Sequence, residues 1–205
     1  MQTCLHGPAS DLLSAVLIAL HKPYDVLSQF TPDVPSQRTL AEFGLPKDVW
    51  PIGRLDRDSE GLLLLSDEKS LVDRLLHPRS KQPKTYLAQV EGIPEKAALD
   101  RLRRGGLDIR GHLCAPAIVD SPDPQPILPP RNPPIRVRKE IPDHWISLTI
   151  TEGKNRQVRR MTAAVGHPTL RLIRVRIGRF PLDPLAPGEW KVLGPEERAQ
   201  VLGGT

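Results

Sequence analysis

The sequence predicts an α+β fold with a mixed, mainly antiparallel sheet and flanking helices. Three observations support this class. Short segments rich in strand-forming residues recur along the chain, and segments with helical spacing lie between several of them. Neighbouring strands are close in sequence, which favours antiparallel or mixed pairing. The 23 prolines among 205 residues fit loops and edge strands better than a helical bundle.

The clearest element of the first half of the chain is Leu62–Leu65. This continuous apolar run predicts a strand that is buried on both faces. Polar residues that can begin a helix follow it at once. In chain order we expect a strand over 16–21, this apolar strand, a helix over 68–76, a strand over 84–92 and a helix over 95–104.

The second half begins with an irregular region. A proline-rich segment over 120–142 is expected to run as an extended loop over the surface. The alternation in Trp145–Thr151 predicts a half-buried strand. The other predicted elements are two short strands within 107–119, a helix over 156–165, and strands over 170–178 and 188–193.

The chain is expected to form one folded domain over 16–195, with tails over 1–15 and 196–205. The proline-rich segment suggests two lobes within the domain, over about 16–125 and 126–195. Contributions from the two parts of the chain can interleave.

Positive charge is concentrated between Arg131 and Arg179, where 12 Lys/Arg stand against 3 Asp/Glu and give a net charge of +9. The remaining residues hold 17 basic and 21 acidic side chains, a net charge of −4. Such a basic segment indicates a polyanionic partner, of which nucleic acid is the commonest. A basic surface without a partner is the alternative.

Composition argues against several classes of protein. Cys4 and Cys114 lack metal-ligand spacing and the six histidines are scattered, so we expect no metal site. Two cysteines, one in the expected tail, fit a reducing cytoplasm. The apolar run over 12–20 is too short to cross a membrane, and no basic residue precedes it as in a signal peptide.

The most informative stretch is Gly53–Gly61, which packs three acids and two arginines directly before the apolar strand. Arginines on both sides of Asp56 favour its ionised form, and an ionised carboxylate can act as nucleophile or base. A calcium loop is one alternative, because acids stand at loop positions one, three and five before a glycine. Against it, Asp67 occupies the position where a calcium loop has a bidentate Glu. A solvated charged turn is the other alternative.

A second charged element lies at Gly153–Met161. On a helical wheel the apolar residues define an inner face, and Arg156 and Arg160 point away from it. Arg159 falls at the flank of the apolar face, where its charge requires a carboxylate. Asp56 is one candidate partner and a surface acid is the other.

Tyr86 lies in the strand predicted over 84–92, on the same face as Ala88 and Val90. A tyrosine at such a position usually belongs to the core. The chain has only two tyrosines, so a functional role for Tyr86 is kept as a hypothesis.

Several motifs together resemble the RsuA-type ribosomal RNA pseudouridine synthases. Gly53–Leu63 is similar to the hallmark motif of that family, and Leu20–Leu27 to its entry motif, with His21 where Asn is usual. Lys84–Tyr86 and Gly153–Met161 are similar to two further motifs. Val165-Gly166, Leu172–Arg174 and Ile177-Gly178 follow in the order of the family, so the resemblance covers about residues 17–193.

The resemblance implies a pseudouridine synthase catalytic fold with two lobes around a central RNA-binding cleft. It implies that Asp56 is the catalytic aspartate and that Tyr86 stacks on the target base and helps remove its C5 proton. It further implies that Arg159 pairs with Asp56 and that Arg54 helps to displace the target base. The reaction isomerises uridine in place, so no cofactor is expected.

We expect the partner to be ribosomal RNA and the protein to be a cytoplasmic monomer. The implied phosphate-binding residues are Lys22, Arg156, Arg160, Arg174 and Arg176. Segments over 25–31 and 131–136 resemble the large-subunit branch of the family, which implies 23S rRNA. Only some sixteen residues precede the first strand, so the S4 domain of many relatives is expected to be absent. A non-catalytic rRNA-binding or ribosome-assembly module is the alternative function.

Overall fold

The computed structural model describes residues 15–135 and 141–203, which form eleven strands and four α-helices. The strands are β1 (Leu17–Lys22), β2 (Val26–Leu27), β3 (Arg38–Thr39), β4 (Trp50–Pro51), β5 (Glu60–Ser66), β6 (Lys84–Glu91), β7 (Ile118–Asp120), β8 (Asp143–Ile150), β9 (Thr169–Ile177), β10 (Phe180–Pro181) and β11 (Trp190–Val192). The α-helices are α1 (Lys69–Leu76), α2 (Lys96–Arg104), α3 (Gln157–Ala164) and α4 (Pro195–Leu202). Short 3-10 helices span Leu40–Phe43 and Pro78–Ser80. None of the described helices is long and apolar enough to cross a membrane.

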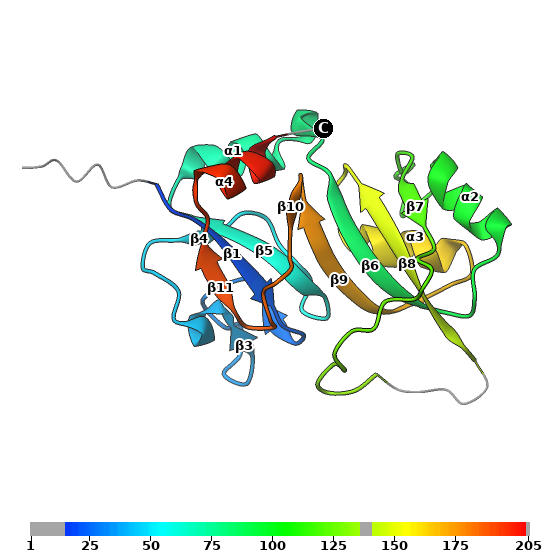
Figure 1. Cartoon of the computed structure of the whole chain (residues 1–205), viewed down its shortest axis with the longest axis horizontal. Helices are drawn as coiled ribbons and strands as arrows, with labels where there is room; N and C mark the ends of the chain where they lie inside the picture. The colour runs from blue at the N-terminus through cyan, green and yellow to red at the C-terminus, as the bar shows by residue number, and fades with distance from the viewer. Residues whose placement is uncertain (1–14, 136–140, 204–205) are drawn as a thin grey trace, which may run out of the picture.

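Nine strands form one sheet with the order β11-β1-β5-β9-β6-β8-β7, in which β4 also pairs with β5 and β10 with β9 (Figure 1). Within this sheet every pair is antiparallel except β5 and β9, which run parallel. The strands β2 and β3 form a separate two-stranded sheet. The predicted α+β class with a mixed, mainly antiparallel sheet is confirmed.

The contact between β5 and β9, here called the seam, consists of Glu60 paired with Ile173 and Gly61 paired with Arg174. Gly61 has a φ of +103°, and a Cβ atom there would lie 2.3 Å from the carbonyl oxygen of Arg174. Only glycine therefore lets the two strands approach at this position. The seam divides the sheet into a first half (β11, β1, β5 and β4) and a second half (β9, β6, β8, β7 and β10).

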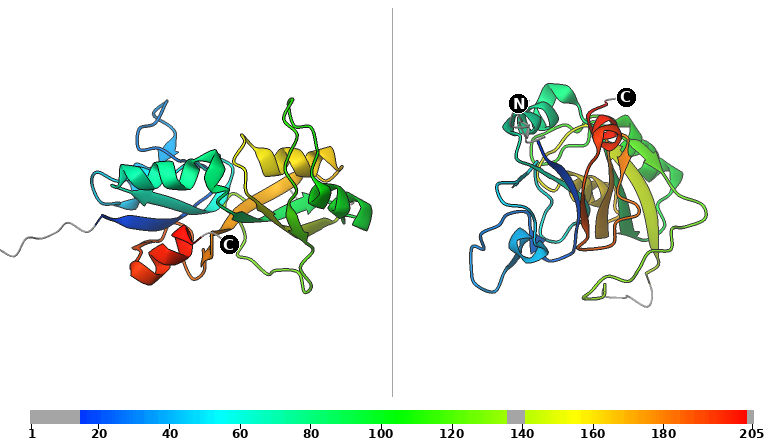
Figure 2. Two further views of the ribbon diagram at one scale, coloured as in Figure 1. Left: turned by 90° about the horizontal axis from the view of Figure 1, so that it is seen from above. Right: turned by 60° about the vertical axis from the view of Figure 1, so that its left-hand side comes forward.

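The two halves do not follow the expected lobe boundary near residue 125. The first half combines strands near the start of the chain with β11, which returns to pair with β1. The second half is formed by the strands from β6 to β10. Figures 1 and 2 show α1 and α4 beside the first half, and α2 and α3 beside the second.

The expected C-terminal tail over 196–205 is wrong for most of its length, because α4 forms there and its Val201 is fully buried. Arg198 of α4 forms an ion pair with Glu68 at the start of α1. The helix is therefore part of the folded first half. The expected tail over 1–15 lies, except for its last residue, outside the described residues.

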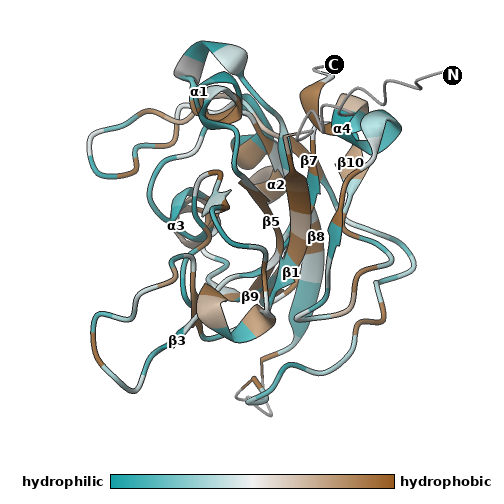
Figure 3. Ribbon diagram, turned by 90° about the vertical axis from the view of Figure 1, so that its left-hand side faces the viewer, coloured by the Kyte–Doolittle hydropathy of each residue, from teal (hydrophilic) through white to brown (hydrophobic). Residues whose placement is uncertain are grey.

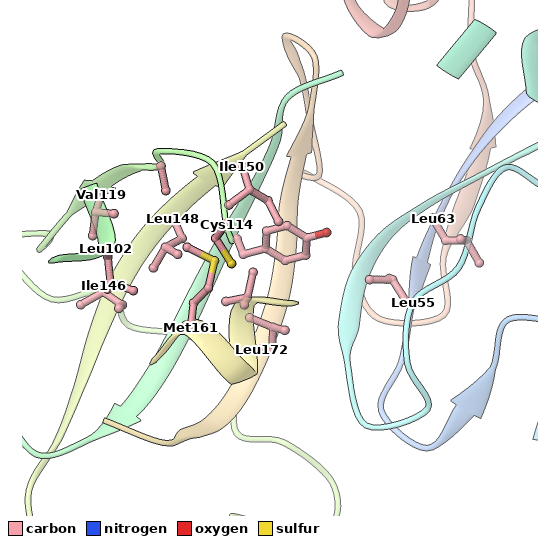
Figure 4. Packing of buried hydrophobic residues seen from close by; sticks show 14 of the residues in the cluster. Leu55, Leu63, Leu102, Cys114, Val119, Ile146, Leu148, Ile150, Met161 and Leu172 are labelled. Carbon is pink, nitrogen blue, oxygen red and sulfur yellow. The ribbon is translucent and has the colours of Figure 1, made fainter. Parts of the chain in front are cut away.

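The apolar core has one cluster on each face of the sheet. Leu63 and Leu65 of β5 point into the first cluster, while Leu62 and Leu64 point into the second. The prediction that this run is buried on both faces is confirmed. The first cluster includes residues of α2 and α3, and the second includes residues of α1 and α4. In Figure 3 hydrophobic residues are concentrated in the central strands, and Figure 4 shows part of the first cluster.

The described part of the proline-rich segment runs over the surface, and several contacts attach it to the rest of the fold. Gln125 exchanges hydrogen bonds with the backbone of Trp145 in β8, at 2.6 Å and 3.3 Å. The carbonyl of Pro129 accepts a hydrogen bond from Arg171 in β9 at 2.8 Å. The Arg131 guanidinium stacks on the ring of Tyr24 at 4.0 Å from its centroid. Residues 121–135 thus connect the second half of the sheet to the first.

Candidate active site

The loop that carries Asp56 joins β4 to β5, and hydrogen bonds to its backbone atoms hold it in place. Ser28 accepts a hydrogen bond from the Leu55 amide at 3.0 Å and donates one to the Leu55 carbonyl at 2.9 Å. The Ser59 amide donates to the Asp56 carbonyl at 3.0 Å, which closes a turn. The chain is fixed on both sides of Asp56, yet 31% of its side chain remains exposed. The carboxylate is therefore both positioned and accessible.

Arg156, at the start of α3, is the cation nearest to this carboxylate among the described ion pairs. It donates two hydrogen bonds to Asp58, at 2.9 Å and 2.8 Å, and its Nη1 lies 3.6 Å from Oδ2 of Asp56. The backbone of Arg156 is left-handed, with a φ of +51°. Both acids of the loop lie against Arg156, and 40% of its side chain is exposed, so its contact with a phosphate stays a prediction.

Arg159 approaches the same loop from the next turn of α3. Its Nη2 donates to the Asp58 carbonyl at 2.7 Å and lies 3.5 Å from the Asp58 carboxylate. Burial lowers the pKa of Arg159, and the charges of Asp58 and Asp56 oppose that shift. The expected direct pair between Arg159 and Asp56 is not among the described ion pairs. Arg159 instead holds the loop through Asp58.

The electrostatics of Asp58 follow from these contacts. Partial burial alone would raise the pKa of Asp58, but the hydrogen bonds from Arg156 and the charge of Arg159 outweigh it and hold the pKa below its usual range. The neighbour of Asp56 is thus a permanent anion between two guanidinium groups at neutral pH. The acids of this loop do not converge on a common point as calcium ligands would, because Asp58 faces Arg156 and Glu60 faces Arg171.

Two residues expected to bind phosphates lie inside the fold. The side chain of Lys22 is fully buried and donates to the carbonyls of Pro23 and Val26, at 2.8 Å each. Burial lowers the pKa of Lys22 to about 7, against the opposing charge of Glu60. Arg174 is also buried and donates to the Leu62 carbonyl at 2.7 Å. The phosphate-binding prediction is wrong for both side chains.

The other predicted RNA-binding residues lie at the surface. Arg54 is exposed, 3.4 Å from the Gln29 side chain, and Arg176 is exposed on β9. Arg160 is partly exposed and donates to Asn155 at 2.6 Å. Their roles stay predictions, and their positions allow a contact with a polyanion.

Tyr86 lies on β6, directly opposite Arg174 of β9, which in turn pairs with Gly61 across the seam. Adjacent strands are about 4.8 Å apart, so the backbone of Tyr86 is about 10 Å from that of Gly61. Tyr86 is buried in the first apolar cluster together with Met161 of α3. Figure 3 shows α3 and β3 on the same side of the sheet. The site therefore combines an acid from the first half with a tyrosine and arginines from the second.

Three buried polar atoms around the seam have no hydrogen-bond partner among the described residues: Ser59 Oγ, Arg159 Nε and Arg174 Nη2. Each belongs to the acid loop or to an element packed against it. Such unpaired donors are rare in a folded protein.

The sequence led us to expect that Asp58 and Glu60 brace the loop by pairing with cations, but it did not identify Arg171 as the partner of Glu60. Glu60 stands within the charged loop motif, and its partner lies 111 positions further along the chain. The alternating pattern of β9 identifies Arg174 and Arg176 as candidate RNA-binding residues. Arg171 projects from the opposite face of that strand. The excess of arginine in β9 was the available signal.

Within the described residues, no three His, Cys, Asp or Glu side chains gather as metal ligands.

Comparison with known proteins agrees with this arrangement. Residues 16–164 match the family described as RNA pseudouridylate synthase. The chain is 60% identical over 173 residues to ribosomal large subunit pseudouridine synthase E of Xanthomonas axonopodis pv. citri. The matched region covers 84% of this chain and 90% of that protein. The protein of the same name from Vibrio parahaemolyticus is 48% identical over 184 residues, covering 90% of this chain and 76% of that protein.

A solved structure described as a pseudouridylate synthase has the same fold. It superposes with a TM-score of 0.74 at 28% identity and covers 92% of this chain and 74% of its own. The resemblance of the motifs to the ribosomal RNA pseudouridine synthases and to their large-subunit branch is confirmed by these matches.

Proposed function

This chain belongs to the RNA pseudouridylate synthase family, and we propose that it converts a uridine of 23S ribosomal RNA to pseudouridine. The observation that carries the proposal is the 60% identity to a ribosomal large subunit pseudouridine synthase across 84% of the chain. The site adds a positioned and accessible carboxylate, Asp56, with a guanidinium 3.6 Å away. Both the acid and the fold suit isomerisation of a flipped-out base.

The proposed reaction begins when the target uridine leaves the RNA stack and enters the site. Asp56 attacks the nucleotide at C1′ of the ribose or at C6 of uracil, and the N1–C1′ bond breaks. The uracil turns, C5 bonds to C1′ and Asp56 is released. C5 then loses its proton to water or a basic side chain, and N1 takes up a proton from water. Atoms and electrons balance within the nucleotide, so the reaction requires no redox partner or group donor.

The chain's own residues divide these tasks. Arg156 places a positive charge 3.6 Å from the Asp56 carboxylate, and Arg159 orients the loop through the Asp58 carbonyl. Tyr86 supplies the aromatic surface for the turned base and assists removal of the C5 proton. Arg54 fills the space that the flipped base leaves in the RNA.

The RNA-binding surface is proposed to include Arg160 and Arg176 together with the wider basic segment over 131–179. Single-stranded and looped RNA is recognised by shape, splayed bases and phosphates, which suits a basic surface beside a deep catalytic group. That the two halves of the sheet enclose the RNA stays a prediction. We further propose that the protein acts as a cytoplasmic monomer without a cofactor.

The experiment uses 23S rRNA labelled with tritium at C5 of uridine, with 16S rRNA as the matched substrate control. Purified protein should release tritium from 23S rRNA and leave 16S rRNA unchanged, and sequencing of the product should locate the pseudouridine. Tight binding to 23S rRNA without tritium release would favour the non-catalytic assembly module. Release from 16S rRNA alone would refute the choice of substrate.

A further inference from the structure

The residues proposed to carry out catalysis lie on opposite sides of the seam. Asp56 precedes β5 in the first half, whereas Tyr86 lies on β6 and Arg159 on α3 beside the second half. The seam itself pairs β5 with β9 through two residue positions, Glu60 with Ile173 and Gly61 with Arg174. The separation of the acid from the tyrosine therefore depends on how firmly this short contact is held.

A buried ion pair crosses the seam at that point. Glu60 and Arg171 are joined by two parallel hydrogen bonds of 2.8 Å, and the side chains are only 4% and 8% exposed. The third donor of Arg171, Nη1, bonds the Pro129 carbonyl at 2.8 Å. One guanidinium thus joins the acid loop, β9 and the proline-rich segment.

The pair acts from the face of the sheet opposite α3. Glu60 points to the same face of β5 as Leu62, and Arg171 points to the same face of β9 as Ile173. Both apolar residues belong to the second cluster. On the other face, Asp58 is held by Arg156 and Arg159 of α3. Arginines from the second half therefore hold the seam on both faces of the sheet. They bind Asp58 on one face and Glu60 on the other, two acids that follow Asp56 in the sequence.

A buried ion pair of this kind adds little to stability, because removing two charges from water costs about as much as their attraction returns. Its planar, two-point geometry does fix the relative orientation of the groups it joins. Glu60 follows Asp56 by four residues, and the turn closed by the Ser59 amide lies between them. Glu60 and Asp56 therefore belong to one short segment that a backbone hydrogen bond holds together.

We propose that Glu60 and Arg171 form a positioning pair that sets the distance from Asp56 to Tyr86 and Arg159 across the seam. This inference rests on the proposed function. The pair touches neither the substrate nor the reacting atoms, and it acts on the rate of the chemical step rather than on RNA affinity. A displacement of about 1 Å at a reacting group can lower a rate about 100-fold.

The test replaces both members with methionine, Glu60→Met together with Arg171→Met, so that no unpaired charge is left buried. We expect the melting temperature and the Kd for 23S rRNA to stay near those of the unaltered protein. Single-turnover tritium release should fall about 10- to 100-fold. The single variant Arg171→Lys keeps the charge, loses the two-point contact and should lower the rate in the same direction.

A matched control removes an ion pair that stays within the first half: Glu68→Met together with Arg198→Met, which join α1 and α4. Its rate of tritium release should equal that of the unaltered protein. Amide hydrogen exchange of Ser59 and Gly61 provides a readout that does not depend on activity, and it should quicken in the Glu60/Arg171 variants alone.

Each outcome is decisive. Unchanged single-turnover rates and unchanged exchange in both Glu60/Arg171 variants would overturn the positioning role. A weaker Kd at an unchanged rate would also overturn it, and would assign the pair to RNA binding. If the unaltered protein releases no tritium, the proposed function fails, while the exchange of Ser59 still reports whether the pair holds the loop.

Discussion

Replacing Gly61 by alanine should open the seam and destabilise the protein. An alanine Cβ would lie 2.3 Å from the Arg174 carbonyl oxygen and 2.7 Å from its amide nitrogen, both of them backbone atoms. Forcing a side chain into a crowded interior costs about 1–3 kcal/mol. The φ of +103° adds about 1–3 kcal/mol for a residue other than glycine.

The two contributions together predict a loss of about 2–6 kcal/mol in the free energy of unfolding. For a chain of this length that corresponds to a melting temperature lower by about 5–20 °C. Thermal and urea unfolding followed by circular dichroism measure both quantities. The matched control is Gly153→Ala, because a Cβ there meets no atom within 4 Å.

Gly153→Ala should change stability by less than about 1 kcal/mol. Equal unfolding curves for Gly61→Ala and the unaltered protein would show that β5 and β9 do not approach through glycine as described. The account of the seam, including the role given to Glu60 and Arg171, would then lose its geometric basis.

Three further predictions concern charged residues. Arg156→Met should lower the single-turnover rate about fivefold, because a partly exposed ion pair contributes about 1 kcal/mol, and an unchanged rate would remove Arg156 from the site. Burial lowers the pKa of Lys22 from 10.5 to about 7, so between about pH 7 and 10 the unfolded state binds more protons than the folded state and stability rises with pH. Lys22→Met should reduce this rise, as measured by urea unfolding across that pH range. A pH profile identical to that of the unaltered protein would contradict the lowered pKa of Lys22. Arg160→Ala should weaken binding to 23S rRNA and reduce the slope of log Kd against log salt by about one, whereas an unchanged slope would show that Arg160 contacts no phosphate.

Local pattern was sufficient to predict most elements of the fold. The leucines of β5 are buried on both faces, as a continuous apolar run requires, and α3 follows the apolar spacing of Val158 and Met161. The C-terminal helix α4 was missed because Val201 is its one buried residue, which leaves little apolar periodicity. The parallel pairing of β5 with β9 depends on long-range topology, for which local sequence carries no signal.

The site shows a similar division between local and long-range information. The motif around Asp56 identifies the candidate acid, and the flank position of Arg159 correctly indicates that it meets a carboxyl-bearing loop. The partner of Arg159 is Asp58, which Arg156 contacts as well. Lys22 and Arg174 were expected at the surface because they are charged, but both are buried and donate hydrogen bonds to backbone carbonyls inside the fold.

Asp56 is proposed to be the nucleophile of an RNA pseudouridine synthase. The most direct measurement is tritium release from C5-labelled 23S rRNA by Asp56→Asn, with Asp58→Asn as a control that removes the neighbouring carboxylate. Asp56→Asn should release no tritium while its Kd for the RNA and its melting temperature stay unchanged. Asp58→Asn should release tritium at a reduced but measurable rate. Tritium release by purified Asp56→Asn at the rate of the unaltered protein would contradict the proposed role of Asp56.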